Sequence, residues 1–94
     1  MLDELFNIIE SRKIALPEHS YTRQLMEAGE NRILRKIGEE SVEVILAAKS
    51  EGDQRIIEEA ADLMYHLLVL LSYRNLTLDQ VKTELAERHQ AKPE

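Results

Sequence analysis

Two short segments of the sequence carry acidic side chains one helical turn apart. The first reads EESVE and contains Glu40 and Glu43, and the second reads EEAAD and contains Glu59 and Asp62. Residues three apart on an α-helix lie on one face, about 5–6 Å apart at Cβ. If the two helices pack antiparallel, Glu40 comes near Asp62 and Glu43 comes near Glu59. Four carboxylates would then converge on one site.

A cluster of this kind would bind a metal ion. Four carboxylates cannot all stay ionised in a half-buried site without a counter-charge. Ligation by oxygen alone suits Mg²⁺, with Mn²⁺ as a substitute. Bound Mg²⁺ bridges carboxylates to substrate phosphates and lowers the pKa of an attacking water. The pattern therefore favours hydrolysis of a phosphoanhydride.

These residues also have simpler interpretations. An E-x-x-E pair in an acidic helical protein is most often a solvated helix face. Asp62 lies in an apolar run, EEAADLMYHLLVLL, where we expect its charge to be desolvated. The alternative to a metal ion is then a buried salt bridge to Arg55 or Lys36. Lys36 could itself reach a substrate phosphate, or it could pair with Glu40 one turn away.

Other chemically active side chains lie nearby. His66 follows Asp62 by one turn, and a lone histidine on an apolar helix is more often a hydrogen-bonded core residue than a ligand. Four further bases are candidate phosphate binders, although surface charge is the commoner role for each of them: Arg23, Arg32, Arg35 and Lys49.

The elements that position these side chains are predicted to be helices. The 94 residues include only three Gly and two Pro, and no segment alternates apolar and polar residues with the period of a strand. An all-α fold of four to five helices follows. The expected helices span residues 2–12, 20–26, 31 to a break at Gly52, 54 to about 74, and 78–89.

Capping residues mark these boundaries. We expect Gly29 and Gly52 to end helices, and we expect N-caps at three positions: Ser20, Asp53, and Thr77 with Gln80 completing a capping box.

Three further expectations concern the first loop, the C-terminal tail and a glycine inside a helix. Pro17 should end the loop after the first helix, and residues 91–94 should form a frayed tail. Gly38, inside the third helix, costs about 1 kcal/mol relative to Ala, which suggests close packing or room for a ligand.

The second half of the helix over residues 54–73 is apolar almost all round, whereas a surface helix has one polar face. A 94-residue chain can hardly surround such a helix, because small domains bury a limited fraction of their surface. We therefore expect residues 1–90 to form one domain, an antiparallel helical bundle completed by homodimerisation.

Net charge, apolar runs and cysteine content limit the binding partners and the cellular location that we expect. Twelve Lys and Arg against eighteen Asp and Glu give a net charge of −6, which argues against nucleic acid. The longest apolar run, residues 67–71, is far shorter than the roughly 20 residues of a membrane span. The N-terminus lacks the pattern of a secretory signal. The absence of cysteine excludes disulfides and thiolate sites. We expect a cytoplasmic protein.

Four stretches carry a family resemblance: SYTRQL at 20–25, RILRKIGEESVEVILAAK at 32–49, EEAADLMYHLLVLL at 58–71 and ERHQ at 87–90. With its two acidic motifs, the chain resembles the all-α nucleotide pyrophosphohydrolase superfamily, which includes MazG-like and dimeric dUTPase-like enzymes. It is most similar to the phosphoribosyl-ATP pyrophosphatase family of histidine biosynthesis.

The resemblance implies a dimeric helical enzyme that requires Mg²⁺ and hydrolyses phosphoribosyl-ATP to phosphoribosyl-AMP and pyrophosphate. It also implies roles for individual residues. The implied metal ligands are Glu40, Glu43, Glu59 and Asp62. Glu39 would be an outer group or the general base, Lys36 a phosphate contact, and the substrate-side residues are Ser20, Tyr21 and Thr22. An N-cap and a packed tyrosine explain Ser20 and Tyr21 equally well.

Two other functions stay open. One is a house-cleaning nucleoside triphosphate pyrophosphatase with a different substrate, and the other is a non-catalytic helical interaction module. Since the sequence leaves no room for a second catalytic domain, we expect a monofunctional protein.

Overall fold

The computed structural model describes residues 1–14 and 20–91. Its elements, in chain order, are α1 (Leu2–Ile14), α2 (Tyr21–Ala28), α3 (Glu30–Leu46), a π-helical turn η1 (Ala47–Glu51), α4 (Asp53–Tyr73) and α5 (Leu78–Ala91). These described ranges contain no strand, so the all-α prediction is confirmed. The expected loop end at Pro17 and tail residues 92–94 lie outside the described residues, and Ala91 belongs to α5.

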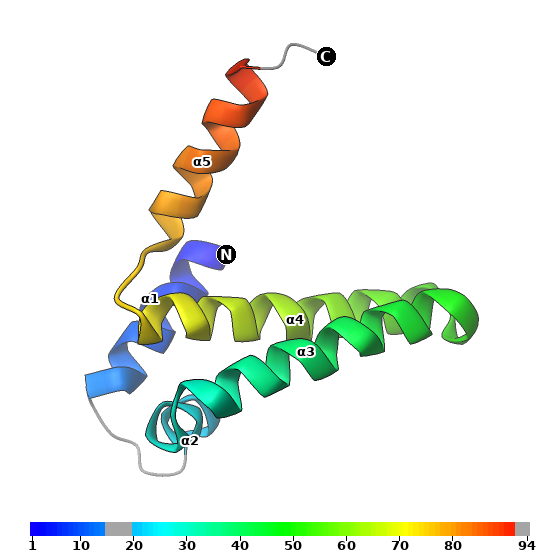
Figure 1. Cartoon of the computed structure of the whole chain (residues 1–94), viewed down its shortest axis with the longest axis horizontal. Helices are drawn as coiled ribbons and strands as arrows, with labels where there is room; N and C mark the ends of the chain where they lie inside the picture. Colours follow the sequence, from blue (N-terminus) through cyan, green and yellow to red (C-terminus); the bar gives the residue numbers. More distant parts are fainter. Residues whose placement is uncertain (15–19, 92–94) are drawn as a thin grey trace.

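An antiparallel hairpin of α3 and α4 dominates the architecture. The two helices run side by side and are joined at one end by η1 and Gly52 (Figure 1). Of all helix pairs in the described part of the chain, this pair makes the most extensive contact. It places the two acidic segments on facing helices, as predicted.

The core lies where α1, α2 and the start of α5 pack against this hairpin. Ile33 of α3 and Val69 of α4 are completely buried. The core consists of Phe6, Ile9, Leu25, Ile33, Leu68, Val69 and Leu78. The end of the hairpin that carries Ile33 and Val69 is therefore held rigidly.

Glycine ends the helices where the sequence predicted. Gly29 (φ 100°) follows α2 and donates its N–H to the Leu25 carbonyl at 3.2 Å. Gly52 (φ 93°) precedes α4. Only glycine adopts such positive φ values without strain, so each chain reversal depends on its glycine. The two helices that carry the acids are thus bounded by glycines.

The predicted N-caps are partly correct. Ser20 accepts the Arg23 N–H at 3.4 Å, and the capping box is present, with Gln80 N–H to Thr77 Oγ1 at 3.2 Å and Thr77 N–H to Gln80 Oε1 at 2.8 Å. The prediction that Asp53 caps α4 is wrong. Asp53 is the first residue of that helix, and its cap is Gly52. Asp53 instead places a negative charge in the first turn, where the helix dipole favours it.

The interior glycine of α3 does not mark close packing. A Cβ built on Gly38 would meet nothing within 4 Å. Gly38 therefore leaves an open strip on the helix.

The helices leave much apolar surface exposed. On α4, Ile57, Met64 and Leu67 face outward. In α5, Leu78 packs in the core while residues 79–89 are exposed, and the helix projects away from the hairpin (Figure 1). Within the described ranges, no helix is both long and apolar enough to cross a membrane.

Candidate metal and phosphate site

Three carboxylates meet where α3 faces α4. Glu40 comes from α3, and Glu59 and Asp62 lie one turn apart on α4. One oxygen from each lies within 4.8 Å of the others. Glu40 and Glu59 are buried, with 9% and 6% exposed, and Asp62 is exposed. Two of the carboxylates are thus held by packing, and the third opens the cluster to solvent.

The environment of Glu40 disfavours its ionised form. Burial raises its pKa above the ordinary value of 4.5, and a hydrogen bond with Glu59 and the charge of Asp62 add to this effect. Lys36 opposes them, with its Nζ 3.5 Å from Glu40 Oε1. The cluster therefore holds more negative charge than its own bases neutralise.

Lys36 and Arg55 hold these acids in place. Lys36 also lies 3.6 Å from Glu39. Burial disfavours the Lys36 ammonium, but the nearby Tyr21 hydroxyl, Glu40 and Glu39 raise its pKa on balance. Arg55 bridges Glu58 and Glu59. The buried Glu59 is therefore paired with an arginine on its own helix.

The expectation that Asp62 is desolvated is wrong, because its side chain is exposed although its neighbours in sequence are apolar. The alternative of a buried salt bridge at Asp62 is also wrong for both proposed bases. Lys36 pairs with Glu39 and Glu40, and Arg55 pairs with acids of its own helix. The α4 side chain that needs a buried partner is Glu59.

The fourth predicted ligand, Glu43, is not part of the three-carboxylate group. It is half-buried, one turn further along α3 than Glu40. Glu39 is exposed and turned to Lys36. The predicted approach of Glu40 to Asp62 is confirmed, and the roles assigned to Glu43 and Glu39 stay predictions.

The SYT segment has structural contacts beside the site. Ser20 caps α2. Thr22 is buried, and its hydroxyl bonds that of Tyr65. Tyr21 is 42% exposed, and its ring stacks on Tyr65 with centroids 6.1 Å apart. The substrate contacts predicted for these three residues stay predictions.

His66 links the SYT segment to the acidic helix. It is buried, its Nδ1 lies 2.8 Å from the Asp62 carbonyl and its Nε2 lies 3.0 Å from the Tyr21 hydroxyl. Nδ1 donates to the carbonyl, so Nε2 accepts from Tyr21. The expected hydrogen-bonded core histidine is confirmed.

Sequence reasoning missed Tyr65. Its pKa is raised by burial, and its ring packs edge-on against His66 with centroids 5.1 Å apart. The available signal was its spacing of one turn from Asp62, which places it beside the acids.

The donor set fits a hard divalent cation. Three carboxylates supply oxygen ligands only, and hard cations such as Mg²⁺ prefer oxygen. A cation would also offset the like charges that raise the pKa of Glu40. The exposed position of Asp62 leaves a side open for phosphate oxygens.

Helical packing that joins three carboxylates in this way defines an all-α protein with an acidic cluster that offers oxygen ligands to a hard cation. A profile of the phosphoribosyl-ATP pyrophosphohydrolase family matches residues 2–89. The chain belongs to this family.

Individual relatives agree with the profile. The chain is 51% identical to a phosphoribosyl-ATP pyrophosphatase of Haloarcula marismortui, over 94% of this chain and 92% of the relative. It is 49% identical to that of Metallosphaera sedula, over 94% and 95% of the two chains. It is 47% identical to that of Pelotomaculum thermopropionicum, over 98% and 94%.

Proposed function

We propose that this protein hydrolyses phosphoribosyl-ATP to phosphoribosyl-AMP and pyrophosphate with Mg²⁺ as cofactor, in the cytoplasmic second step of histidine biosynthesis. The family match supports the substrate. One observation supports the proposed metal-dependent hydrolysis: carboxylate oxygens of Glu40, Glu59 and Asp62 lie within 4.8 Å of one another.

In this proposal three acids hold the cation, and Glu43 supplies a fourth ligand from the next turn of α3. When bound, Mg²⁺ neutralises polyphosphate charge and supplies a water of lowered pKa. Lys36 stays protonated at neutral pH, because its pKa is raised on balance, and its ammonium is a point charge for a phosphate oxygen. The exposed Glu39 accepts the proton of the attacking water.

The substrate lies over the open side of the site. The exposed edge of Tyr21 is held by its bond to His66 and by Tyr65, so it offers a fixed polar edge to a nucleotide. Ser20 and Thr22 hold this segment through the α2 cap and the bond to Tyr65.

The direct test is release of pyrophosphate from phosphoribosyl-ATP with and without Mg²⁺, beside a panel of ordinary nucleoside triphosphates. We expect turnover of phosphoribosyl-ATP only, and a loss of at least about 100-fold in Asp62→Asn, since removing one charge-stabilising group costs about that much. Turnover of dUTP or dCTP instead would identify a house-cleaning enzyme. No turnover of any substrate would leave a non-catalytic module.

We further propose that the protein is a homodimer. The chain has 6758 Å² of accessible surface, whereas a compact monomer of its mass exposes about 5,600 Å². Its radius of gyration is 15.0 Å, against about 12 Å for a compact domain of this length. The excess surface is of the size that a stable interface buries on each partner.

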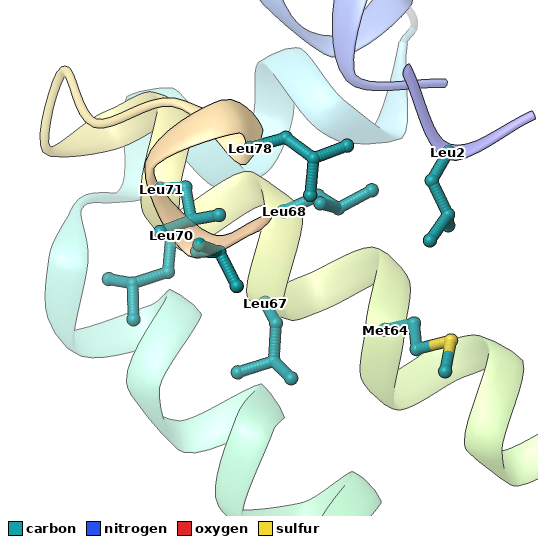
Figure 2. A pocket seen from close by; sticks show the side chains of 8 residues that line it. Leu2, Met64, Leu67, Leu68, Leu70, Leu71 and Leu78 are labelled. Atoms are coloured by element: carbon teal, nitrogen blue, oxygen red, sulfur yellow. The ribbon is translucent and has the colours of Figure 1, made fainter. Parts of the chain in front are cut away.

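An apolar groove marks where a second copy would dock. It has a volume of about 310 Å³ and lies between α1, α4 and α5 (Figure 2). Its lining is Leu2, Met64, Leu67, Leu68, Leu70, Leu71, Leu78 and Val81. An exposed groove made only of such side chains favours burial against another apolar surface.

Light scattering tests the dimer. We expect twice the chain mass at working concentration, and the monomer mass for Leu67→Glu, which would place a charge in the interface. The variant Leu85→Glu, on the exposed part of α5 and outside the lining of the groove, serves to locate the interface. A monomeric wild-type protein would contradict the proposal.

A further inference from the structure

A second hollow lies beside the start of α3. It has a volume of about 440 Å³ and is lined by Ala28, Asn31, Arg32 and Arg35. The apolar groove of Figure 2 is lined only by leucine, valine and methionine side chains, whereas two arginines and an asparagine line this hollow. Its chemistry suits an anion.

The two arginines have no carboxylate within salt-bridge distance among the described residues. Of the five other arginines, four pair with a carboxylate: Arg23 of α2, Arg55 of α4, Arg74 just after α4 and Arg88 of α5. Arg12 of α1 has no such pair among the described residues. The contrast is notable in a chain with a net charge of −6. Both arginines of the hollow are exposed residues.

One arginine of the hollow, Arg32, is in line with the carboxylate cluster along α3. Arg32, Lys36 and Glu40 are four residues apart along α3, so successive members are neighbours on one side of the helix. At a rise of 1.5 Å per residue, Arg32 lies about 12 Å along the axis from Glu40. A ligand on the carboxylates could therefore extend past Lys36 into the hollow.

We propose that Arg32 and Arg35 bind the phosphomonoester at the far end of the substrate, on the ribose that is remote from the polyphosphate. This inference rests on the proposed function. In the proposed function the polyphosphate is held at Glu40, and Arg32 lies about 12 Å further along α3. The phosphate on the remote ribose is the other anionic group that phosphoribosyl-ATP carries, and it lies at the opposite end of the substrate from the polyphosphate.

Arginine suits this contact for geometric reasons. The planar guanidinium group of arginine binds two phosphate oxygens at once. Arg32 and Arg35 are three residues apart, so they can approach one phosphate from two sides. Ordinary nucleoside triphosphates lack this phosphomonoester on a second ribose. The hollow would therefore select for phosphoribosyl-ATP without touching the bond that is cleaved.

The test compares wild-type protein with the double variant Arg32→Gln/Arg35→Gln in steady-state hydrolysis of phosphoribosyl-ATP. A hydrogen bond to a charged group contributes about 1.5–3 kcal/mol, so we expect KM to rise by roughly tenfold or more while kcat changes less than about twofold. ATP lacks the phosphomonoester on a second ribose, so its inhibition constant should be the same for the double variant and the wild type. Arg88→Gln, on α5, is the matched control for lost charge and should behave as wild type.

Several results would overturn the inference. An unchanged KM in the double variant would exclude the contact. A fall in kcat alone would place the arginines at the reacting phosphates, and an equal loss of ATP inhibition would assign them to the triphosphate. Each single variant and Arg35→Lys are measured as well, with circular dichroism as the check on folding, so that one misfolded protein does not decide the outcome.

Calorimetry separates this inference from the proposed activity. Wild-type protein that binds phosphoribosyl-AMP at least tenfold more tightly than the double variant would support the arginine site even if hydrolysis were not detected. Equal affinities would refute the site. A wild-type protein that does not hydrolyse phosphoribosyl-ATP would refute the proposed function alone.

Discussion

Replacing Glu40 with Gln should change stability in opposite directions with and without a divalent ion. Without the ion, Glu40 is a buried carboxylate beside two others. Gln keeps its size and can donate an amide hydrogen bond to Glu59, but it removes the charge that burial and the neighbouring acids disfavour. The metal-free variant should therefore be more stable than the wild type.

The size of the gain follows from the distances. Two unit charges 4.8 Å apart repel by about 3.5 kcal/mol at an effective dielectric constant of about 20, which is appropriate for Glu59, and by about 0.9 kcal/mol in bulk water, which is closer to the exposed Asp62. Arg55 already offsets part of the Glu59 charge. The lost pair with Lys36 costs about 0–1 kcal/mol. We expect a net gain on the order of 2 kcal/mol, or roughly 8–16 °C in Tm.

With Mg²⁺ the order should reverse. An ion at 100 times its Kd stabilises the folded wild type by about 2.7 kcal/mol, and the variant lacks one of the three ligands that would hold it. Thermal unfolding at fixed protein concentration, with EDTA and then with Mg²⁺, measures both effects. Glu27→Gln, which removes an exposed acid paired with Arg23, is the control and should shift the unfolding free energy by less than about 0.5 kcal/mol.

Two results would refute this reasoning. A metal-free Glu40→Gln protein less stable than the wild type would mean that Lys36 stabilises Glu40 by more than burial and repulsion cost. A variant that keeps the full Mg²⁺ shift would remove Glu40 from the ligand set.

Three further predictions concern α3 and α5. Burial raises the pKa of Glu40 above 4.5, so the contribution of Glu40 to metal-free stability is fully present below about pH 4.5 and is lost as pH rises through the raised pKa. The Tm of the wild type minus the Tm of Glu40→Gln should therefore fall with rising pH. Over the same pH range, the Mg²⁺ affinity of the wild type, measured by calorimetry, should rise. Gly38→Ala should stabilise the protein against urea by about 0.5–1 kcal/mol, since the added methyl meets nothing within 4 Å; destabilisation would show that the open strip is occupied. Thr77→Ala should destabilise by about 0.5–2 kcal/mol, visible as loss of helical ellipticity in α5, and no loss would mean that the capping box contributes nothing.

The features of the acidic site that depend on local helix geometry could be predicted from the sequence. The spacing of Glu59 and Asp62 fixes one face of α4, and the glycine at position 52 fixes the reversal that brings Glu40 opposite. These relations depend only on helical period and chain connection, so they can be obtained without knowing the core.

The errors concern rotation and partners, which the helical period leaves undetermined. Asp62 was expected to be buried because its sequence neighbours are apolar, but successive residues on a helix point about 100° apart, and only packing decides which direction is solvent. The pairing of Arg55 with Glu59 likewise depends on Glu59 being the buried acid. Tyr65 was overlooked since its partner Thr22 is distant in sequence.

The π-helical turn between α3 and α4 has a consequence for how this chain tolerates changes in length. η1 closes with the Gly52 N–H donating to the Ala47 carbonyl at 3.2 Å, and Ala47 is fully buried. One residue added there would change where the chain reverses and so the register and rotation of α4 against α3, which would carry two of the three acids away from Glu40. Insertions and deletions between residues 47 and 52 should therefore be far less acceptable to this protein than changes in the length of α5, whose outer turns touch little else.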